Sequence, residues 1–359
     1  MSFLRPFRNA MGIDVSDQGL RMVQLVPHGH SFSLRSISAR PLEPGIIVEG
    51  EIRNPAKAGE VLRDLVRKPS LHHPTTKSAT LCLPERKTFT KIIEVPRQPA
   101  NTFEPALREG LAENIPLKLD EAYVDWQVVP LQSDKSKTVR VIVSVAPQLL
   151  VEGYIAMCQQ AGVVPVVLEP ESAALCRSTL DGIPSTGSHL IVDLGATRTG
   201  IIIAETDLVA YSSTVSLSGT GLTQALQTKL GLSAEEAEQA KRICGLDPKR
   251  GKGAVKTTLE PEIRPLLQRL LEVISFYEEH AIKDAKVQDI TLVGGGARLS
   301  FLPELVQSTM SLPVRVGSWP KSVNVPSANL KNSGSSYLTA LGLALRGATG
   351  APWSNPHLI

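Results

Sequence analysis

Two stretches of the chain share one pattern of apolar and polar positions. In each, an apolar run ends at an aspartate, a short turn of small polar residues follows, and a second apolar run leads away. They are residues 11–25, MGIDVSDQGLRMVQL, and residues 189–211, HLIVDLGATRTGIIIAETDLVAY. Apolar runs on both sides of a turn are typical of a β-hairpin. The pattern predicts two hairpins of one design, with Asp14 and Asp193 at their mouths.

The turn of the second hairpin, residues 194–197, has residue types that suit a phosphate and a metal ion. Gly195 permits a positive φ and a close approach to backbone N–H groups. These N–H groups and Thr197 can donate to phosphate oxygens, while Asp193 can hold Mg²⁺. One such turn alone is equally consistent with an ordinary β-turn. The second copy near the N-terminus favours a duplicated fold that closes on a nucleotide.

The remaining pattern of the first half predicts an α/β domain with an insert of about 60 residues that reads strand–helix–strand–strand. Asn54 and Pro55 have the residue types that begin a helix, and proline after Ile115 ends the helix of the insert. Strands are expected over residues 31–38, 78–83, 88–95, 122–129, 139–145 and 163–168, helices over 54–68, 99–114, 148–161 and 170–179, and a linker over 182–187.

The second half predicts a second sheet with helices. Ser218–Gly221 opens a helix to Leu230 whose N-terminal amides can face a phosphate. Ser233 and Glu236 form a capping box for the next helix. Strands are expected over 207–217, 289–293 and 313–316, long or short helices over 260–285, 299–309 and 334–346, a mobile basic segment over 245–258, a loop over 317–333 and an unstructured tail after 347.

Composition narrows the class of protein. The 359 residues are 42% hydrophobic with a net charge of +3, which gives no electrostatic argument for nucleic acid or an anionic membrane. The absence of a long apolar run or a signal peptide predicts a cytoplasmic protein. Four widely spaced cysteines without a C-x-x-C pair predict reduced thiols, not a disulfide framework or a zinc site.

Two glycine-rich segments imitate nucleotide motifs without matching them. Residues 245–253, GLDPKRGKG, have one residue too many for a P-loop and lack Ser or Thr after Lys252. Gly219-x-Gly221 lacks the third glycine of the Rossmann fingerprint. The sequence shows no recognisable Ser/His/Asp or Cys/His arrangement for nucleophilic catalysis.

The order of these pieces resembles the actin–Hsp70–sugar-kinase superfamily, and within it the PilM family of type IV pilus assembly proteins, which is similar to the cell-division protein FtsA. The match consists of the following segments: two phosphate loops (14–21 and 193–198), two connecting helices (169–174, EPESAA, and 335–346), an adenosine motif (294–296) and the run 107–125 of the insert, LREGLAENIPLKLDEAYVD.

The resemblance implies an α/β, actin-like (RNase H-like, duplicated) fold with two domains around a nucleotide cleft. Its implied parts are subdomain 1A (1–85 and 147–182), the inserted subdomain 1C (86–146), subdomain 2A (183–230 and 286–346), subdomain 2B (231–285) and a flexible tail (347–359).

It also implies ATP and Mg²⁺ as cofactors, with Asp14 and Asp193 as metal ligands. The nucleotide-binding residues that it implies are Asp14, Ser16, Asp17, Gln18, Arg21, Asp193, Gly195, Ala196, Thr197, Arg198, Gly219, Gly221, Glu238, Lys241, Gly294, Gly295, Gly296 and Arg298. Glu169 is the implied catalytic residue of at most a slow ATPase; its alternative role is to cap the helix that begins at Pro170.

The first loop departs from the family pattern, which has Gly, small hydroxyl residues and then Lys where this chain has Ser16, Asp17, Gln18 and Arg21. Asp17 repels phosphates unless it points away or helps to hold Mg²⁺.

The implied partner is the N-terminal cytoplasmic peptide of a PilN-type inner-membrane protein, held between the first subdomain and the insert. The implied location is the cytoplasmic face of the inner membrane. Two alternatives stay open from the sequence: a metabolic kinase of the same superfamily, and a self-polymerising actin-like filament protein.

Overall fold

A computed structural model describes residues 9–97, 105, 107, 111, 118–129, 138–182, 187–205, 208–280 and 285–349. The chain divides into two compact units. Unit 1 consists of Met1–Leu25, Arg35–Glu171 and Arg346–Ile359, and unit 2 of Val26–Leu34 and Ser172–Leu345. The division into four subdomains and a tail stays a prediction.

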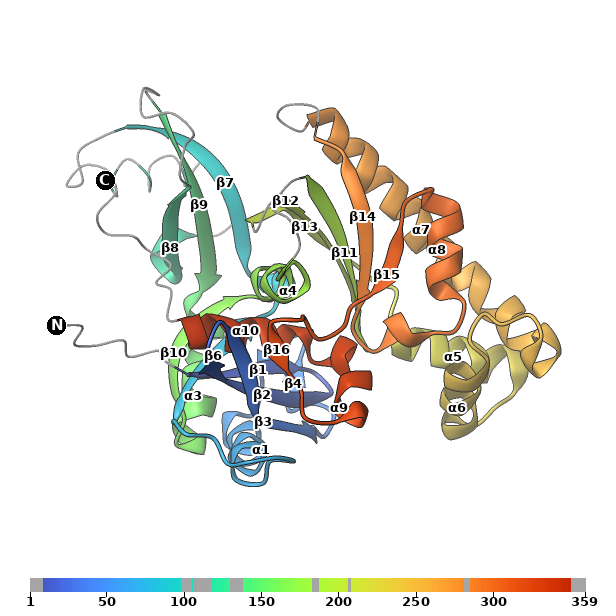
Figure 1. Ribbon diagram of the computed structural model, residues 1–359, viewed down its shortest axis with the longest axis horizontal. Helices are drawn as coiled ribbons and strands as arrows, with labels where there is room; N and C mark the ends of the chain where they lie inside the picture. Colours follow the sequence, from blue (N-terminus) through green and yellow to red (C-terminus); the bar gives the residue numbers. More distant parts are fainter. Residues whose placement is uncertain are drawn as a thin grey trace. The chain divides into compact units, whose positions relative to one another are not determined.

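The main sheet of unit 1 is built around the first predicted hairpin (Figure 1). Strands β1 (Met11–Ser16) and β2 (Gly19–His28) pair antiparallel and place Asp14 opposite Arg21. The sheet order is β10-β6-β1-β2-β3-β16, with β3 (Ser31–Pro41), β6 (Ser78–Leu83) and β10 (Val164–Pro170). The tips of β2 and β3, residues 26–34, are counted with unit 2, as is β16 (Val323–Asn324).

Two helices cover the core of unit 1. Helix α1 (Pro55–Arg67) begins where predicted, because Asn54 Oδ1 accepts a hydrogen bond from the Lys57 N–H. It packs against α3 (Gln148–Ala161), and both bury apolar residues against the sheet, including Leu62 and Tyr154. A short hairpin, β4 (Ile47–Val48) with β5 (Glu51–Ile52), lies before α1.

The predicted insert forms its own three-stranded sheet in unit 1. Its order is β7-β9-β8, with β7 (Phe89–Pro96), β8 (Ala122–Val129) and β9 (Thr138–Pro147). The expected helix over 99–114 lies outside the described residues except for 105, 107 and 111, which are helical; Leu107 and Leu111 are buried in the core of the insert.

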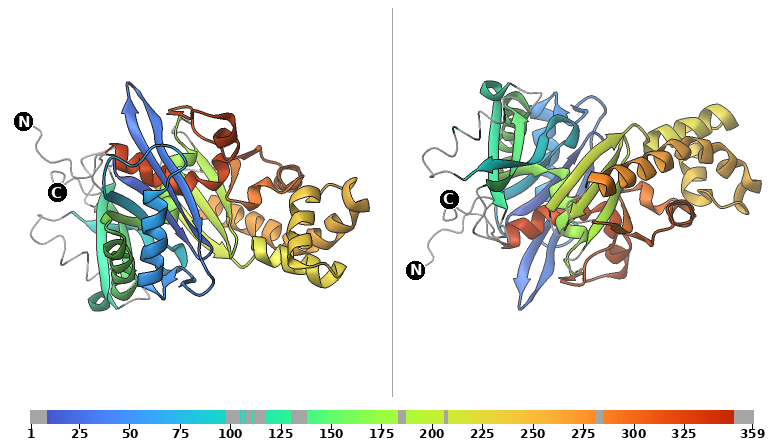
Figure 2. Two further views of the ribbon diagram at one scale, coloured as in Figure 1. Left: turned by 90° about the horizontal axis from the view of Figure 1, so that it is seen from below. Right: turned by 90° about the horizontal axis from the view of Figure 1, so that it is seen from above.

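Unit 2 contains the second predicted hairpin, β11 (Ser188–Leu194) with β12 (Thr199–Glu205). The sheet order is β13-β12-β11-β14-β15, and β14 (Val287–Val293) runs parallel to β11, with Asp193 beside Val293. The other elements of unit 2 (Figures 1 and 2) are β13 (Leu208–Val215), α5 (Gly219–Leu230), α6 (Ala234–Cys244), α7 (Ala254–His280), α8 (Leu302–Met310), β15 (Val314–Val316) and α9 (Ala328–Asn332).

The two connecting helices each cross a unit boundary along the chain. They are α4 (Glu171–Thr179), which unit 2 contains from Ser172 onward, and α10 (Leu338–Thr349), whose residues up to Leu345 belong to unit 2. Within unit 2 the two helices touch closely: a Cβ added to Gly342 would lie 1.8 Å from the Ala174 carbonyl oxygen. Only glycine at this position permits the observed separation.

Three expectations about local structure are wrong. Residues 245–258 are ordered, because α7 begins at Ala254 and buries Val255 and Leu259 in the core of unit 2. Residues 317–333 contain β16 and α9, and helix α10 starts at Leu338 after a 3-10 turn over Gly334–Ser336.

In the described parts of the chain, no helix is both long and apolar enough to cross a membrane.

Candidate functional site

In unit 1, Asp14 is held at the end of β1 by side chains from two neighbouring strands. Its carboxylate is largely buried, with the whole residue 8% exposed. Arg21 on β2 places Nη1 3.3 Å from Asp14 Oδ2, and the thiol of Cys82 on β6 donates to Oδ1 at 3.5 Å. Asp14 and Arg21, both predicted site residues, are therefore brought together.

Residues 16–18, in the turn that follows Asp14, include an acid that is hydrogen-bonded within unit 1. Asp17 accepts hydrogen bonds from the backbone N–H groups of Glu49 (3.2 Å) and Gly50 (2.8 Å), so its carboxylate stabilises the β4–β5 turn. Ser16 Oγ donates to the Gly19 carbonyl at 2.8 Å, and the side chain of Gln18 is exposed. The chain thus resolves the charge conflict that the sequence poses at Asp17: the carboxylate is already bonded within the fold.

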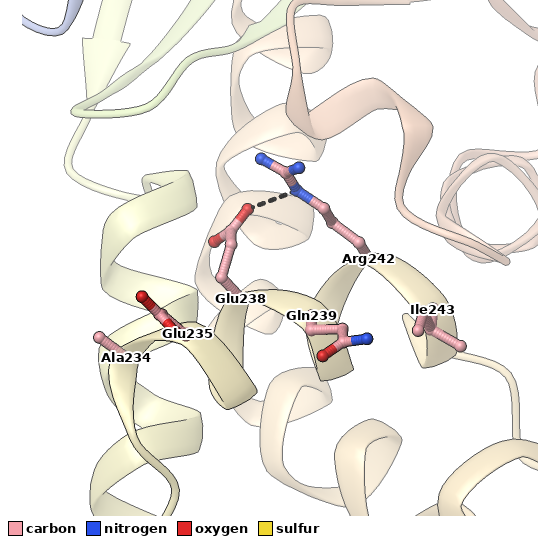
Figure 3. Close-up of a pocket in the computed structure, with 6 residues that line it drawn as sticks. All are labelled: Ala234, Glu235, Glu238, Gln239, Arg242 and Ile243. Atoms are coloured by element: carbon pink, nitrogen blue, oxygen red, sulfur yellow. Dashed lines mark hydrogen bonds and ion pairs between the residues drawn. The ribbon is translucent and has the colours of Figure 1, made fainter.

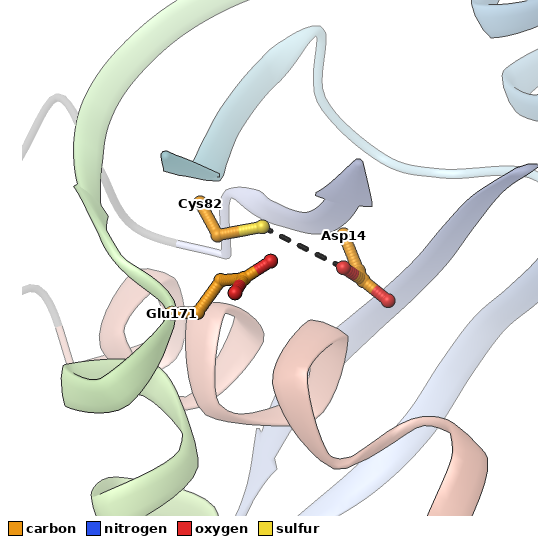
Figure 4. Close-up of side chains that lie close together, drawn as sticks. All are labelled: Asp14, Cys82 and Glu171. Atoms are coloured by element: carbon orange, nitrogen blue, oxygen red, sulfur yellow. Dashed lines mark hydrogen bonds between the residues drawn. The ribbon is translucent and has the colours of Figure 1, made fainter. Parts of the chain in front are cut away.

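Sequence reasoning missed Glu171, which joins Asp14 and Cys82 (Figure 4). One ligand atom of each residue lies within 4.8 Å of those of the other two. Burial, together with the negative charges of Asp14 and Glu171, raises the pKa of the Cys82 thiol well above its ordinary value. Cys82 is therefore set apart from the other buried cysteines, Cys158 and Cys176, by its acidic neighbours.

Glu169, the predicted catalytic residue, lies near the end of β10, just before α4, and faces away from solvent. It is 1% exposed, and its Oε2 accepts a hydrogen bond from Arg346 Nη1 at 2.5 Å. Helix α4 begins at Glu171. The motif EPESAA therefore supplies one acid to a buried ion pair and another to the surroundings of Asp14.

In unit 2, Asp193 lies beside the glycine segment that follows β14. Gly294 has φ +80°, and a Cβ there would lie 2.5 Å from Asp193 Oδ1. Gly296 is equally confined, since its Cβ would lie 2.8 Å from Leu194 Cβ. Two segments about a hundred residues apart in sequence, both among the predicted nucleotide-binding residues, are therefore in contact.

Gly195 serves the turn in a different way from the one expected. Its φ is not positive; instead its N–H donates to the Arg198 carbonyl at 2.9 Å, and a Cβ would lie 2.8 Å from that oxygen. Glycine is needed here for a close backbone contact. The side chains of Ala196 and Thr197, at the tip of the turn, are exposed.

The N-terminal amides of α5, which the sequence suggested could face a phosphate, are hydrogen-bonded within the fold. The N–H groups of Gly219 and Thr220 donate to the carbonyls of Gly195 and Ala196, each at 3.0 Å. The Gly221 N–H donates to Ser218 Oγ at 3.1 Å. These amides position the second loop and have no donor left for a ligand.

Lys241 on α6 is hydrogen-bonded to the N-terminal part of helix α5. Its Nζ lies 2.7 Å from each of three oxygens: the Gly219 carbonyl, Thr223 Oγ1 and Glu238 Oε2. Burial alone would raise the pKa of Glu238, but hydrogen bonds from Lys241 and Thr223 outweigh it and lower the pKa to about 2. Glu238 is therefore charged at neutral pH and shares α6 with Lys241, as the spacing predicts.

One face of α6 borders an open hollow of about 480 Å³ (Figure 3). Glu238 lines it and receives a third hydrogen bond, from Arg242 Nε to its Oε1 at 2.8 Å. Its lining residues are Ala234, Glu235, Glu238, Gln239, Arg242 and Ile243. The lining combines the charged side chains of Glu235, Glu238 and Arg242 with Ile243, which is half exposed.

Gly295 and Arg298 differ from the rest of the glycine segment, because both are open to solvent. Gly295 has ordinary helical backbone angles (φ −66°, ψ −36°), and no atom lies within 4 Å of the position a Cβ would take. No local contact of the chain explains a glycine here. A ligand that packs against this backbone would explain it.

Comparison with known proteins fixes the family. The family description of type IV pilus assembly protein PilM matches residues 12–348. The chain belongs to the PilM family. A solved structure titled "PilM-PilN type IV pilus biogenesis complex" is similar to it, with 24% identity, a TM-score of 0.82, and coverage of 97% of this chain and 100% of the other.

Two further structures show that this PilM-family chain has the actin-like fold. MreB 5 of Spiroplasma citri bound to AMPPNP is 12% identical with a TM-score of 0.53, covering 95% of this chain and 96% of that one. The ethanolamine utilization protein EutJ from Carboxydothermus hydrogenoformans is 16% identical with a TM-score of 0.55, covering 94% and 89%. The predicted fold and family are confirmed.

Proposed function

We propose that this PilM-family chain binds Mg²⁺–ATP and serves as an adaptor of type IV pilus assembly at the cytoplasmic face of the inner membrane. The observation that carries the proposal is the family match over residues 12–348, which includes both aspartate hairpins. A bound nucleotide stabilises the conformation that it contacts by mass action, which suits a protein that presents a surface to a partner.

The proposed nucleotide contacts come from two sets of residues. Unit 1 supplies Asp14 and Arg21, and unit 2 supplies Asp193, the exposed turn residues Ala196 and Thr197, and the open backbone at Gly295. Mg²⁺, when bound, neutralises phosphate charge and takes oxygen ligands, for which Asp14 and Asp193 are suited. Asp17 and the α5 amides have structural roles and are left out of this set.

The surroundings of Glu169 favour retention of ATP over turnover. A general base must reach the water that it activates, and Glu169 is instead buried against Arg346. At most slow hydrolysis is expected from this arrangement.

Nucleotide binding is tested by two substitutions with different structural consequences. Asp193→Ala removes the acidic ligand and is expected to abolish retention of ATP. Gly295→Val adds a side chain where the structure has room for it, so the melting temperature without nucleotide stays that of the wild type. If the adenosine packs on Gly295, ATP affinity falls at least tenfold; unchanged affinity in both variants would show that ATP binds elsewhere or not at all.

The proposed partner is the N-terminal peptide of a PilN-type inner-membrane protein, bound on unit 1. The similar complex contains PilM and PilN by its title. On unit 1, β8 pairs with the end of β9 just before α3 begins, with Tyr123 opposite Ala146. Tyr123 is 50% exposed and Leu149, the second residue of α3, is 85% exposed, so the junction of insert and α3 presents apolar side chains.

Binding of a fluorescent PilN-type N-terminal peptide, measured by anisotropy with and without Mg²⁺–ATP, tests this surface. Tyr123→Ser and Leu149→Ser are expected to weaken binding at least tenfold. Leu271→Ser is the matched control, because Leu271 is an exposed apolar residue of α7 in unit 2. No binding of the peptide to the wild type in either nucleotide state would refute the adaptor function.

A further inference from the structure

We propose that Asp14, Cys82 and Glu171 form a binding site for a thiophilic divalent metal ion of the Zn²⁺ class. The three side chains come from β1, β6 and the first residue of α4, and they point toward one another (Figure 4). All three belong to unit 1, so the site does not depend on unit 2.

The spacing of two of the donor atoms already matches a tetrahedral metal. Zn–S and Zn–O bonds of ordinary length at a tetrahedral angle place sulfur and oxygen about 3.6 Å apart. Cys82 Sγ and Asp14 Oδ1 lie 3.5 Å apart. The third donor atom, a carboxylate oxygen of Glu171, lies within 4.8 Å of both. Glu171 is half-buried, which leaves an approach on its side of the cluster.

The charges of the site balance once a divalent ion is bound; without the ion, Asp14 and Glu171 disfavour the Cys82 thiolate. Arg21 pairs with Asp14 Oδ2, which leaves Oδ1 directed at Cys82. When a metal binds, the S–H bond of Cys82 breaks, the proton leaves to solvent and the sulfur bonds the metal. Two carboxylates, one thiolate, one guanidinium and one divalent cation then sum to zero.

The donor set distinguishes this site from the proposed Mg²⁺ site, although Asp14 belongs to both. Mg²⁺ prefers oxygen ligands, whereas a thiolate selects softer ions such as Zn²⁺ and Cd²⁺. The proposal rests on the described geometry of unit 1 and not on nucleotide binding. We therefore test it without ATP, so that its failure and that of the proposed nucleotide site are separate results.

The probe is Cd²⁺, whose bond to a thiolate gives an ultraviolet charge-transfer band. The full chain is titrated under reducing conditions in a Cys244→Ser background, because Cys244 is the cysteine that is partly exposed. We expect one equivalent of Cd²⁺ to produce the band, Zn²⁺ to displace it, and excess Mg²⁺ to leave it unchanged. Cys82→Ser is expected to abolish the band. Cys158→Ser, which removes another buried thiol of unit 1, is expected to retain it.

A second measurement covers the event that Cys82→Ser does not fold. Glu171 is half-buried, and Glu171→Gln keeps its shape; this variant is expected to bind Cd²⁺ at least tenfold more weakly and to lose the rise in melting temperature that Zn²⁺ gives the wild type. A band that survives Cys82→Ser, or no band and no thermal shift in the wild type, would overturn the proposal.

Discussion

The contact between α4 and α10 yields a sharp prediction about stability. Gly342→Ala would place a Cβ 1.8 Å from the Ala174 carbonyl oxygen, and this acceptor is backbone, so it cannot rotate away. The Gly342 carbonyl also accepts a hydrogen bond from Arg177 Nη1 at 2.9 Å, which holds the two helices at this distance. The helices must separate to admit the methyl group.

The magnitude follows from two opposing effects. Overpacking a tight interface costs roughly 1–3 kcal/mol and more when backbone must move. Alanine recovers about 1 kcal/mol of helix propensity over glycine. Taking the upper end of the overpacking cost, because the obstacle is backbone, we expect Gly342→Ala to lower the free energy of unfolding by about 2 kcal/mol. At the usual 2–4 °C per kcal/mol for units of this size, the melting temperature falls by about 4–8 °C.

The same substitution elsewhere provides the control. Gly153 lies inside α3, and its added Cβ would find its nearest neighbour, Ile52 Cβ, at 3.7 Å, which is ordinary van der Waals contact. Gly153→Ala is therefore expected to stabilise the protein by about 0.5–1 kcal/mol. Urea unfolding and thermal melting of both variants measure the difference. A Gly342→Ala variant as stable as Gly153→Ala would refute the close helix contact.

Three further predictions concern charged groups. The pKa of Glu238 is lowered from 4.5 to about 2, so its charge stabilises the folded state fully above about pH 5 and less as the pH falls toward 2. The difference in unfolding free energy between the wild type and Glu238→Gln should therefore shrink between about pH 5 and about pH 2. A difference that stays constant over this interval would contradict the prediction. Arg346→Met leaves Glu169 buried without its cation and should cost about 3–5 kcal/mol; adding Glu169→Gln should restore more than half, as measured by urea unfolding. Asp17→Ala removes two backbone hydrogen bonds and should cost about 1–2 kcal/mol while leaving ATP affinity, measured by calorimetry, unchanged.

The fold was predictable where its signals are local. The cap of α1 at Asn54 and the capping box of Ser233 and Glu236 at α6 are formed by residues three apart, so the sequence shows both partners side by side. The start of α7 was not predictable in this way. Pro261 suggests a first turn, yet the helix begins at Ala254, because burial of residues such as Leu259 and Ile263 along the helix outweighs the cost of two internal prolines.

The candidate site was predictable only in part, for the same reason. The resemblance assigned Asp193 and Gly294 to one site, and the structure places them together because both lie at the ends of adjacent parallel strands. It could not show that Glu169 pairs with Arg346, which is 177 residues away in sequence. The two acids of EPESAA lie on either side of the junction between β10 and α4, and the sequence does not show that Glu169 pairs with Arg346 while Glu171 joins Asp14 and Cys82.

The hydrogen bonds around Lys241 have a consequence for how events at α6 reach the turn of the second hairpin. The Lys241 ammonium group donates a hydrogen bond to the Gly219 carbonyl, and the Gly219 N–H donates one to the Gly195 carbonyl. Two hydrogen bonds therefore connect helix α6, the start of α5 and the turn in series. Any molecule that displaces α6 must therefore either move the turn with it or break one of these hydrogen bonds. A molecule bound in the hollow on α6 is expected to change the position of the turn that follows Asp193 without contacting Asp193 itself.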